Sequence, residues 1–92
     1  MSKIKNRREG IMNNKLVLIE WVDSYSFYEQ WDFIKEISEP EMVKCISVGF
    51  VIKENNDSIM ILPHISGKNE AGRGGICIPR ISIIKTIELS YE

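Results

Sequence analysis

The residues best suited to chemistry lie in one short stretch of the chain, HISGKNEAGRGGICIPR at residues 64–80. Its four glycines allow backbone amides to come close to an anion. Lys68, Arg73 and Arg80 supply positive charge, and arginine offers forked donors for phosphate oxygens. The only histidine of the chain, His64, stands at the entrance. This combination favours recognition of a phosphorylated group, with a solvated loop or a subunit contact as the alternative interpretations.

The spacing argues against nucleotide hydrolysis. The Gly67-Lys68 pair has no upstream P-loop glycine, and Asn69 follows where a P-loop has Ser or Thr. No Ser/His/Asp order is suggestive, and paired carboxylates occur only at positions expected on the surface. We therefore expect a protein that is not an enzyme and has no catalytic residues.

The two cysteines, Cys45 and Cys77, are too few for a disulfide framework. Both lie in alternating apolar runs, where a thiol usually packs as a small hydrophobe. His64 has no CxxC or HxxxH motif beside it, so the sequence supplies no zinc site. We expect no metal and no cofactor, and a reactive Cys/His pair is the minor alternative.

Arg80 is the strongest single candidate for a ligand contact, because Pro79 restricts the backbone beside it. A structural ion pair is an equally supported role for it. Among the aromatic residues, Trp21 and Trp31 are expected in the core, which leaves two tyrosines as the stackers on a base. The predicted ligand-binding residues are Arg80, Arg73, Lys68, Tyr25, Tyr28 and His64.

The elements that must position these residues are mainly strands. The first is rich in branched and aromatic residues, and from residue 42 onward apolar residues alternate with polar ones. Gly49 in mid-strand indicates a bend, and ENND at residues 54–57 is typical of a tight hairpin turn. The expected strands cover residues 15–23, 42–54, 58–63, 75–79 and 81–89.

Residues 24–37, SYSFYEQWDFIKEI, predict a helix or an irregular helical insertion after the first strand. Ser26 and Glu29 have the spacing of a capping box, and Pro40 disfavours a helix beyond residue 38. An apolar stripe would then face the core, formed by Tyr28, Trp31, Phe33, Ile34 and Ile37.

Together these elements predict a mainly β fold, a small five-stranded SH3-like or Sm-like barrel with one helical insertion. Closing the sheet removes exposed strand edges. An open meander packed on the helix is the alternative. With 92 residues, the chain supports one domain, which we assign to residues 12–92.

Residues 1–11 carry four bases and one acid and have no apolar periodicity. They are either a disordered leader or the product of a mis-annotated start, in which case translation begins at Met12. Since the whole chain has 12 bases and 13 acids, residues 12–92 have 8 bases and 12 acids, a net charge of −4. An acidic domain is a poor general binder of nucleic acid.

No apolar run approaches the roughly 18 residues that a membrane span needs, and no apolar segment follows the basic N-terminus as in a secretory signal. We therefore expect a cytoplasmic protein with no membrane partner. The remaining cations are unevenly placed. Residues 64–85 hold four bases and one acid, whereas residues 20–41 hold seven acids and one base. This asymmetry suits head-to-tail contacts between subunits.

Three short motifs, WVDS at residues 21–24, SVGF at 47–50 and IPR at 78–80 followed by spaced isoleucines, resemble a family of small phage-encoded proteins with an Sm-like barrel. The resemblance covers Lys15–Leu89. The chain departs from the pattern at Phe50, where a tryptophan is expected. It also lacks the Asp/Asn and Arg-Gly loop signature by which Sm proteins hold uridines, so RNA is the less expected partner.

The resemblance implies a homo-oligomer, either a ring or a tetramer, without catalytic machinery. By analogy with small oligomeric phage proteins, it suggests a sponge in the cytoplasm of a bacterial host. Such a sponge sequesters a cyclic nucleotide signal of antiviral defence, such as a CBASS or Thoeris messenger. The competing functions are an Sm-like RNA-binding ring and a structural or adaptor protein with no small ligand.

Overall fold

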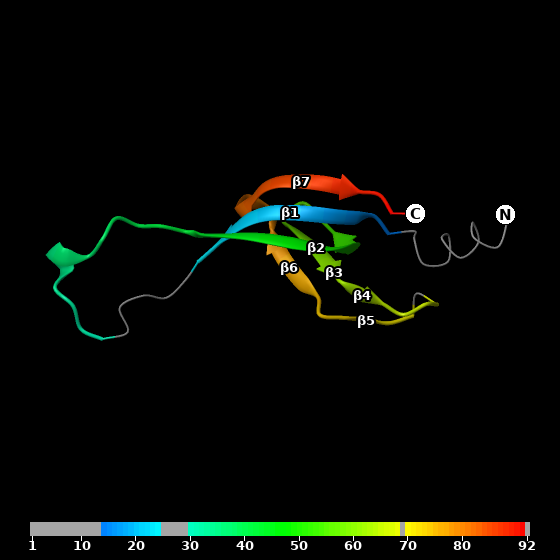
Figure 1. The fold of residues 1–92 in the computed structure, drawn as a ribbon, viewed down its shortest axis with the longest axis horizontal. Coiled ribbons are helices and arrows are strands. Elements are labelled where there is room, and N and C mark those ends of the chain that lie inside the picture. Colours follow the sequence, from blue (N-terminus) through cyan, green and yellow to red (C-terminus); the bar gives the residue numbers. More distant parts are fainter. Residues whose placement is uncertain (1–13, 25–29, 69, 92) are drawn as a thin grey trace.

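The computed structural model describes residues 14–24, 30–68 and 70–91, so the leader and Met12 lie outside the described residues. Within them, seven strands and two short 3-10 turns follow one another along the chain (Figure 1). The strands are β1 (Leu16–Asp23), β2 (Val43–Glu54), β3 (Ser58–Leu62), β4 (His64–Ile65), β5 (Gly72–Arg73), β6 (Ile76–Pro79) and β7 (Ile83–Leu89). The 3-10 turns are η1 (Ile34–Glu36) and η2 (Arg80–Ser82).

The prediction of a mainly β fold is confirmed. Five strands form one antiparallel sheet in the order β6-β3-β2-β1-β7, and β4 pairs with β5 in a separate hairpin. The closed barrel is not formed: in the described residues β6 and β7 are the two edges of the sheet and do not pair. Only η2 separates β6 from β7 along the chain. The two strands nevertheless lie at opposite edges of the sheet, because β6 pairs with β3 and β7 pairs with β1.

The long strand β2 divides the sheet into two parts. Its residues from Val43 to Phe50 pair with β1, and those from Phe50 to Glu54 pair with β3. The register of the second pairing shifts between Val51 and Lys53, which marks a bulge. Gly49 lies two residues before this shift and is buried.

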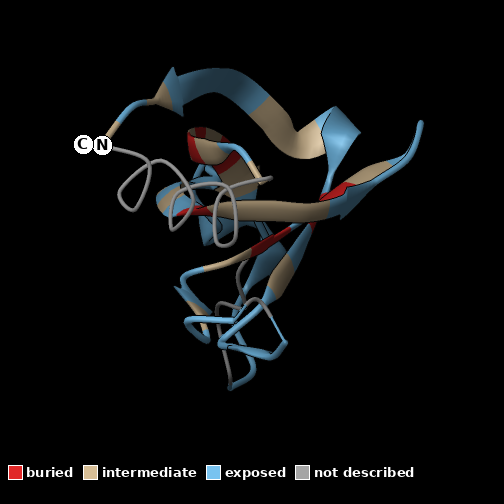
Figure 2. Cartoon of the chain, turned by 90° about the vertical axis from the view of Figure 1, so that its right-hand side faces the viewer, coloured by how far each residue is buried: buried red, intermediate tan, exposed pale blue. Residues whose placement is uncertain are grey.

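The core lies between the two parts of the sheet. Alternate residues of β1 are buried, as expected for a strand with one face on the core. The indole of Trp21 is only 9% exposed and donates a hydrogen bond from Nε1 to Ser47 Oγ at 3.0 Å. Figure 2 shows the few buried positions, in red, on strands of the sheet, with most of the described chain exposed or half-buried. The buried core consists of Val17, Ile19, Trp21, Ile59, Ile61 and Ile78.

The predicted ENND turn is confirmed and closes through its own side chain. Asn55 Oδ1 accepts hydrogen bonds from the backbone amides of Asp57 and Ser58 at 2.9 and 2.8 Å. The Asn55 amide in turn donates to the Ser58 carbonyl at 3.0 Å. The Asn55 side chain thus provides an acceptor for two backbone amides of the turn, which would otherwise donate to water.

The predicted insertion differs most from the structure. In residues 30–42 no α-helix forms, and the only regular element there is the turn η1. This segment projects away from the sheet (Figure 1), so its apolar side chains have no core to pack on, and Trp31 is fully exposed at 101%. The core position predicted for Trp31 is therefore wrong in the single chain. An amphipathic helix is stabilised mainly by packing, which explains the failure of the prediction. Residues 25–29, including Tyr28 and the predicted cap, lie outside the described residues.

No helical segment in the part of the chain that the structure describes is long and apolar enough to cross a membrane.

Candidate ligand-binding hairpin

The first part of the glycine-rich stretch, residues 64–73, forms the β4–β5 hairpin. His64 pairs with Arg73 and Ile65 with Gly72. Ser66 closes the tip: its amide donates to the Ala71 carbonyl at 2.7 Å, and its hydroxyl oxygen accepts from the amides of Glu70 and Ala71 at 3.0 and 3.2 Å. These amides therefore already have partners, and they do not form an open nest for an anion. Sequence reasoning missed this role of Ser66, although Ser is a common turn residue.

The hairpin brings two of the predicted site residues together. Residues directly opposite in an antiparallel pair project to the same face, so His64 and Arg73 share one side of the hairpin. Both side chains are exposed. They border a surface pocket of about 300 Å³ whose walls also include backbone and small side chains from the tip. The lining residues are His64, Ile65, Ser66, Ala71, Gly72 and Arg73.

A second pocket of about 240 Å³ lies where the hairpin meets the end of the sheet. It shares Ile65, Ala71 and Gly72 with the first, so the hairpin contributes to both. Its only charged residue is Glu70, which makes it less suited to an anion. The first pocket, with a guanidinium and an imidazole on its wall, is the better candidate for a phosphorylated ligand.

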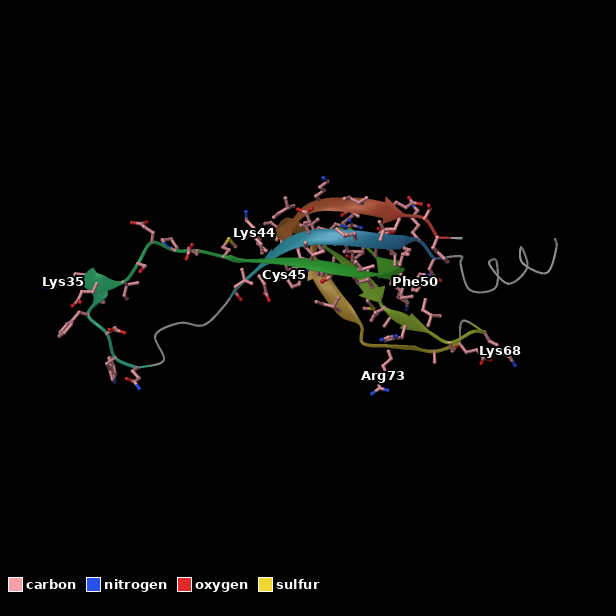
Figure 3. All side chains as sticks on the ribbon, in the orientation of Figure 1. Lys35, Lys44, Cys45, Phe50, Lys68 and Arg73 are labelled. Atoms are coloured by element: carbon pink, nitrogen blue, oxygen red, sulfur yellow. The ribbon has the colours of Figure 1, made fainter. Side chains whose placement is uncertain are left out.

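Lys68 occupies the tip of the hairpin, and Figure 3 shows both Lys68 and Arg73 extending away from the sheet. Both are exposed, so their charge is available to a ligand or to a neighbouring molecule. Gly74 leaves the hairpin with φ of 78°, a conformation that side chains other than glycine's adopt only under strain. This glycine turns the chain from β5 into β6 and so fixes where Arg73 stands relative to the sheet.

Arg80 does not join this cluster within one chain. It follows the far end of β6, a four-residue strand that spans about 13 Å. Its side chain is held by two contacts there: Nε donates to the Asn55 carbonyl at 2.7 Å, and Nη2 pairs with Glu54 Oε1 at 2.6 Å. The structural ion pair expected as the alternative role is thus present, and a ligand contact by Arg80 stays a prediction.

We expect Arg80→Ala to lower the free energy of unfolding by about 1 kcal/mol. The substitution removes one exposed ion pair and one hydrogen bond, which anchor the turn between β2 and β3 to η2. Urea unfolding followed by circular dichroism measures this. Glu54→Gln is the matched control, because it removes the ion pair and keeps the contact with Asn55. Stability that is unchanged in Arg80→Ala would show that the observed contacts contribute nothing.

The structure places only some of the other residues on which the sequence made a prediction. Tyr25 and Tyr28 lie outside the described residues. Cys45 packs against the core, as predicted, but Cys77 is exposed, because Ile76 and Ile78 on either side of it take the inward positions of β6. In the described part of the chain, no three His, Cys, Asp or Glu side chains gather in a way that could hold a metal ion.

The charge asymmetry of the sequence becomes a separation in space. Lys68 and Arg73 stand on the hairpin, whereas the acidic segment around Lys35 lies at the opposite end of the molecule (Figure 3). Among the described residues that line the two pockets, Glu70 is the only carboxylate.

No protein-family model matches this chain, and comparisons with curated proteins and with solved structures found no similar protein.

Proposed function

We propose that this protein is a non-enzymatic homo-oligomer that binds and sequesters a small phosphorylated ligand, with a cyclic nucleotide signal of bacterial antiviral defence as the ligand class. The observation that carries the proposal is the pairing of His64 with Arg73 on one side of the β4–β5 hairpin, beside the pocket of about 300 Å³. Arg73 supplies a forked donor for phosphate, and His64 adds a ring donor.

Two features support an SH3-like or Sm-like assignment for the sheet. The strand order β6-β3-β2-β1-β7 places the last two strands at opposite edges. A 3-10 turn, η2, connects them. The turn η2 lies at the tight Pro-Arg step that the sequence prediction placed before the last strand.

A homo-oligomer, ring or tetramer, would complete a site that is small and open in one chain. Ligand pockets usually enclose about 300–1,000 Å³, and the hairpin pocket is at the lower end of that range. A second subunit can supply further walls, and it can bring its own Arg80 or an aromatic residue to the ligand. Sequestration requires only tight binding, so no catalytic group is needed.

The test is a thermal-shift screen of the full chain against cyclic dinucleotides, cyclic trinucleotides, ADP-ribose derivatives and short RNAs. A ligand that binds only the folded state, at a hundred times its Kd, adds about 2.7 kcal/mol, which for a domain of this size corresponds to a shift of about 10–20 °C. We expect one cyclic nucleotide to give this shift. Arg73→Ala should abolish it and Arg73→Lys should weaken it, because lysine lacks the forked donor.

Lys53→Ala is the matched control, since it removes an exposed cation outside the hairpin. A shift that Lys53→Ala reduces as much as Arg73→Ala does would place the site elsewhere. Binding to short RNAs that weakens steeply with salt would instead favour the Sm-like RNA-binding ring. No shift with any compound would overturn the small-ligand function and leave the structural or adaptor function.

A further inference from the structure

The segment from residue 30 to residue 42, here called the arm, presents an unusual surface for a single chain. Trp31, Phe33 and Ile34 are 101%, 73% and 86% exposed, and Met42 at its base is 64% exposed. Soluble monomers rarely expose a contiguous group of large apolar residues. The arm also carries four acids and one base, a net charge of −3. It is therefore an apolar and acidic surface.

The outer face of the β1-β2-β7 part of the sheet is also apolar, but it is bordered by lysines instead of acids. Register places Leu18 opposite both Val48 and Ile87, on the face away from the buried Val17 and Ile19. Ile46 lies two residues from Val48 on the same face of β2. We call these four the outer patch: Leu18, Ile46, Val48 and Ile87. Ile46, Val48 and Ile87 are 68%, 45% and 37% exposed.

Two lysines border the outer patch on the same face. Lys44 pairs with Val22 and Lys85 pairs with Glu20, and alternation places all four on the side of Leu18. The two lysines outnumber the one carboxylate among them, which leaves a net charge of +1. An apolar face with lysines at its edge complements an arm whose apolar residues are interspersed with carboxylates. Charge and apolar character therefore match between two surfaces of the same chain that do not meet within it.

We propose that the arm of one copy docks on the outer patch of a second copy, and that the two copies exchange arms about a two-fold axis. Such an interface is closed and uses the same two surfaces twice. One buried aromatic side chain covers about 150–250 Å², so Trp31 and Phe33 would supply about 300–500 Å² of the roughly 800 Å² that a stable interface buries on each partner. The exposed Ile34, Met42 and the outer patch would supply the rest.

The proposal also explains the conformation of the arm. The β1-β2 ribbon carries the arm away from its own sheet (Figure 1), which places Trp31 beyond the reach of the core. A second copy offers Trp31 and Phe33 the apolar contact that the single chain does not. The contact needs no ligand, so it stands or falls independently of the function proposed for the β4–β5 hairpin.

The experiment measures the mass of the full chain by light scattering and analytical ultracentrifugation across a dilution series. We expect a dimer or a multiple of it. Truncating interface tryptophans commonly weakens association about thirtyfold or more, and we expect this of Trp31→Ser and, on the other surface, of Ile46→Ser. Ile81→Ser is the matched control, since Ile81 is an exposed apolar residue that lies in η2, outside both surfaces.

Mixing the two variants gives the sharpest readout. A heterodimer of Trp31→Ser with Ile46→Ser keeps one intact contact, formed by the arm of the second variant on the patch of the first, so the mixture should associate more tightly than either variant alone. Two results would overturn the proposal: a wild-type chain that is monomeric throughout the series, or association that Trp31→Ser and Ile46→Ser leave unchanged. The thermal screen is a separate readout: loss of the ligand shift with association intact would contradict the hairpin site and leave the contact between arm and outer patch standing.

Discussion

Trp21→Ala should lower the free energy of unfolding by about 3–5 kcal/mol, the range for removing a large aromatic side chain from a core. The expected effect is large because domains of this kind are stable by only about 5–15 kcal/mol in total. Trp21 is among the six core residues that are buried in the described part of the chain, and it joins β1 to β2 through Ser47. Its loss would leave a cavity between the two parts of the sheet and an unpaired hydroxyl at its edge.

Urea unfolding followed by far-ultraviolet circular dichroism checks this, because the signal does not depend on the tryptophan itself. Trp21→Phe retains most of the ring and should be milder. Trp31→Ala is the matched control: it removes the same side chain from a fully exposed position, so the isolated chain should change by less than about 0.5 kcal/mol. That comparison must be made at dilution, below any association. Equal losses for the two alanine variants would show that Trp21 is not a core residue.

The contrast between the two tryptophans shows what the sequence could reveal. The strands were predictable because apolar residues that alternate with polar ones indicate a strand with one buried face. All five expected strands are present in the expected order. The arm was not. Its apolar spacing suited a helix, but an apolar stripe shows only that a partner is needed, and the sequence does not say whether that partner belongs to the same chain.

The candidate site was predictable only in part, for a related reason. Residue types alone pointed to His64, Lys68, Arg73 and Arg80 as a group. The register of β4 with β5 then places His64 beside Arg73. The pairing of β3 with β6 carries Arg80 to the opposite end of the strand, where Glu54 and the turn at Asn55 hold it. Residues a few positions apart along the chain are far apart in space when an extended strand separates them, whereas residues paired across two strands are close.

Gly49→Val should be the second severe substitution, with a loss of about 1–3 kcal/mol or more from overpacking. Even a Cβ at this position would lie 3.0 Å from the Leu62 carbonyl oxygen and 3.2 Å from Ile61 Cβ. The first contact is with backbone, which cannot move without disturbing the pairing of Leu62 with Phe50. The side chain would therefore force β3 away from β2 where the two parts of the sheet fold together.

Gly67→Val is the matched control, because nothing lies within 4 Å of a Cβ built there and the residue is exposed. Both variants pass through the same urea titration, so the difference between their midpoints isolates the close approach from the general effect of replacing glycine. If Gly49→Val unfolds with the midpoint of Gly67→Val, the close approach of β3 to β2 does not depend on a residue without a side chain. A large difference would instead show that one glycine sets how closely β3 packs over β2. That packing holds Leu62, and through Pro63 the β4–β5 hairpin, in place, so the glycine would act on the candidate site without touching it.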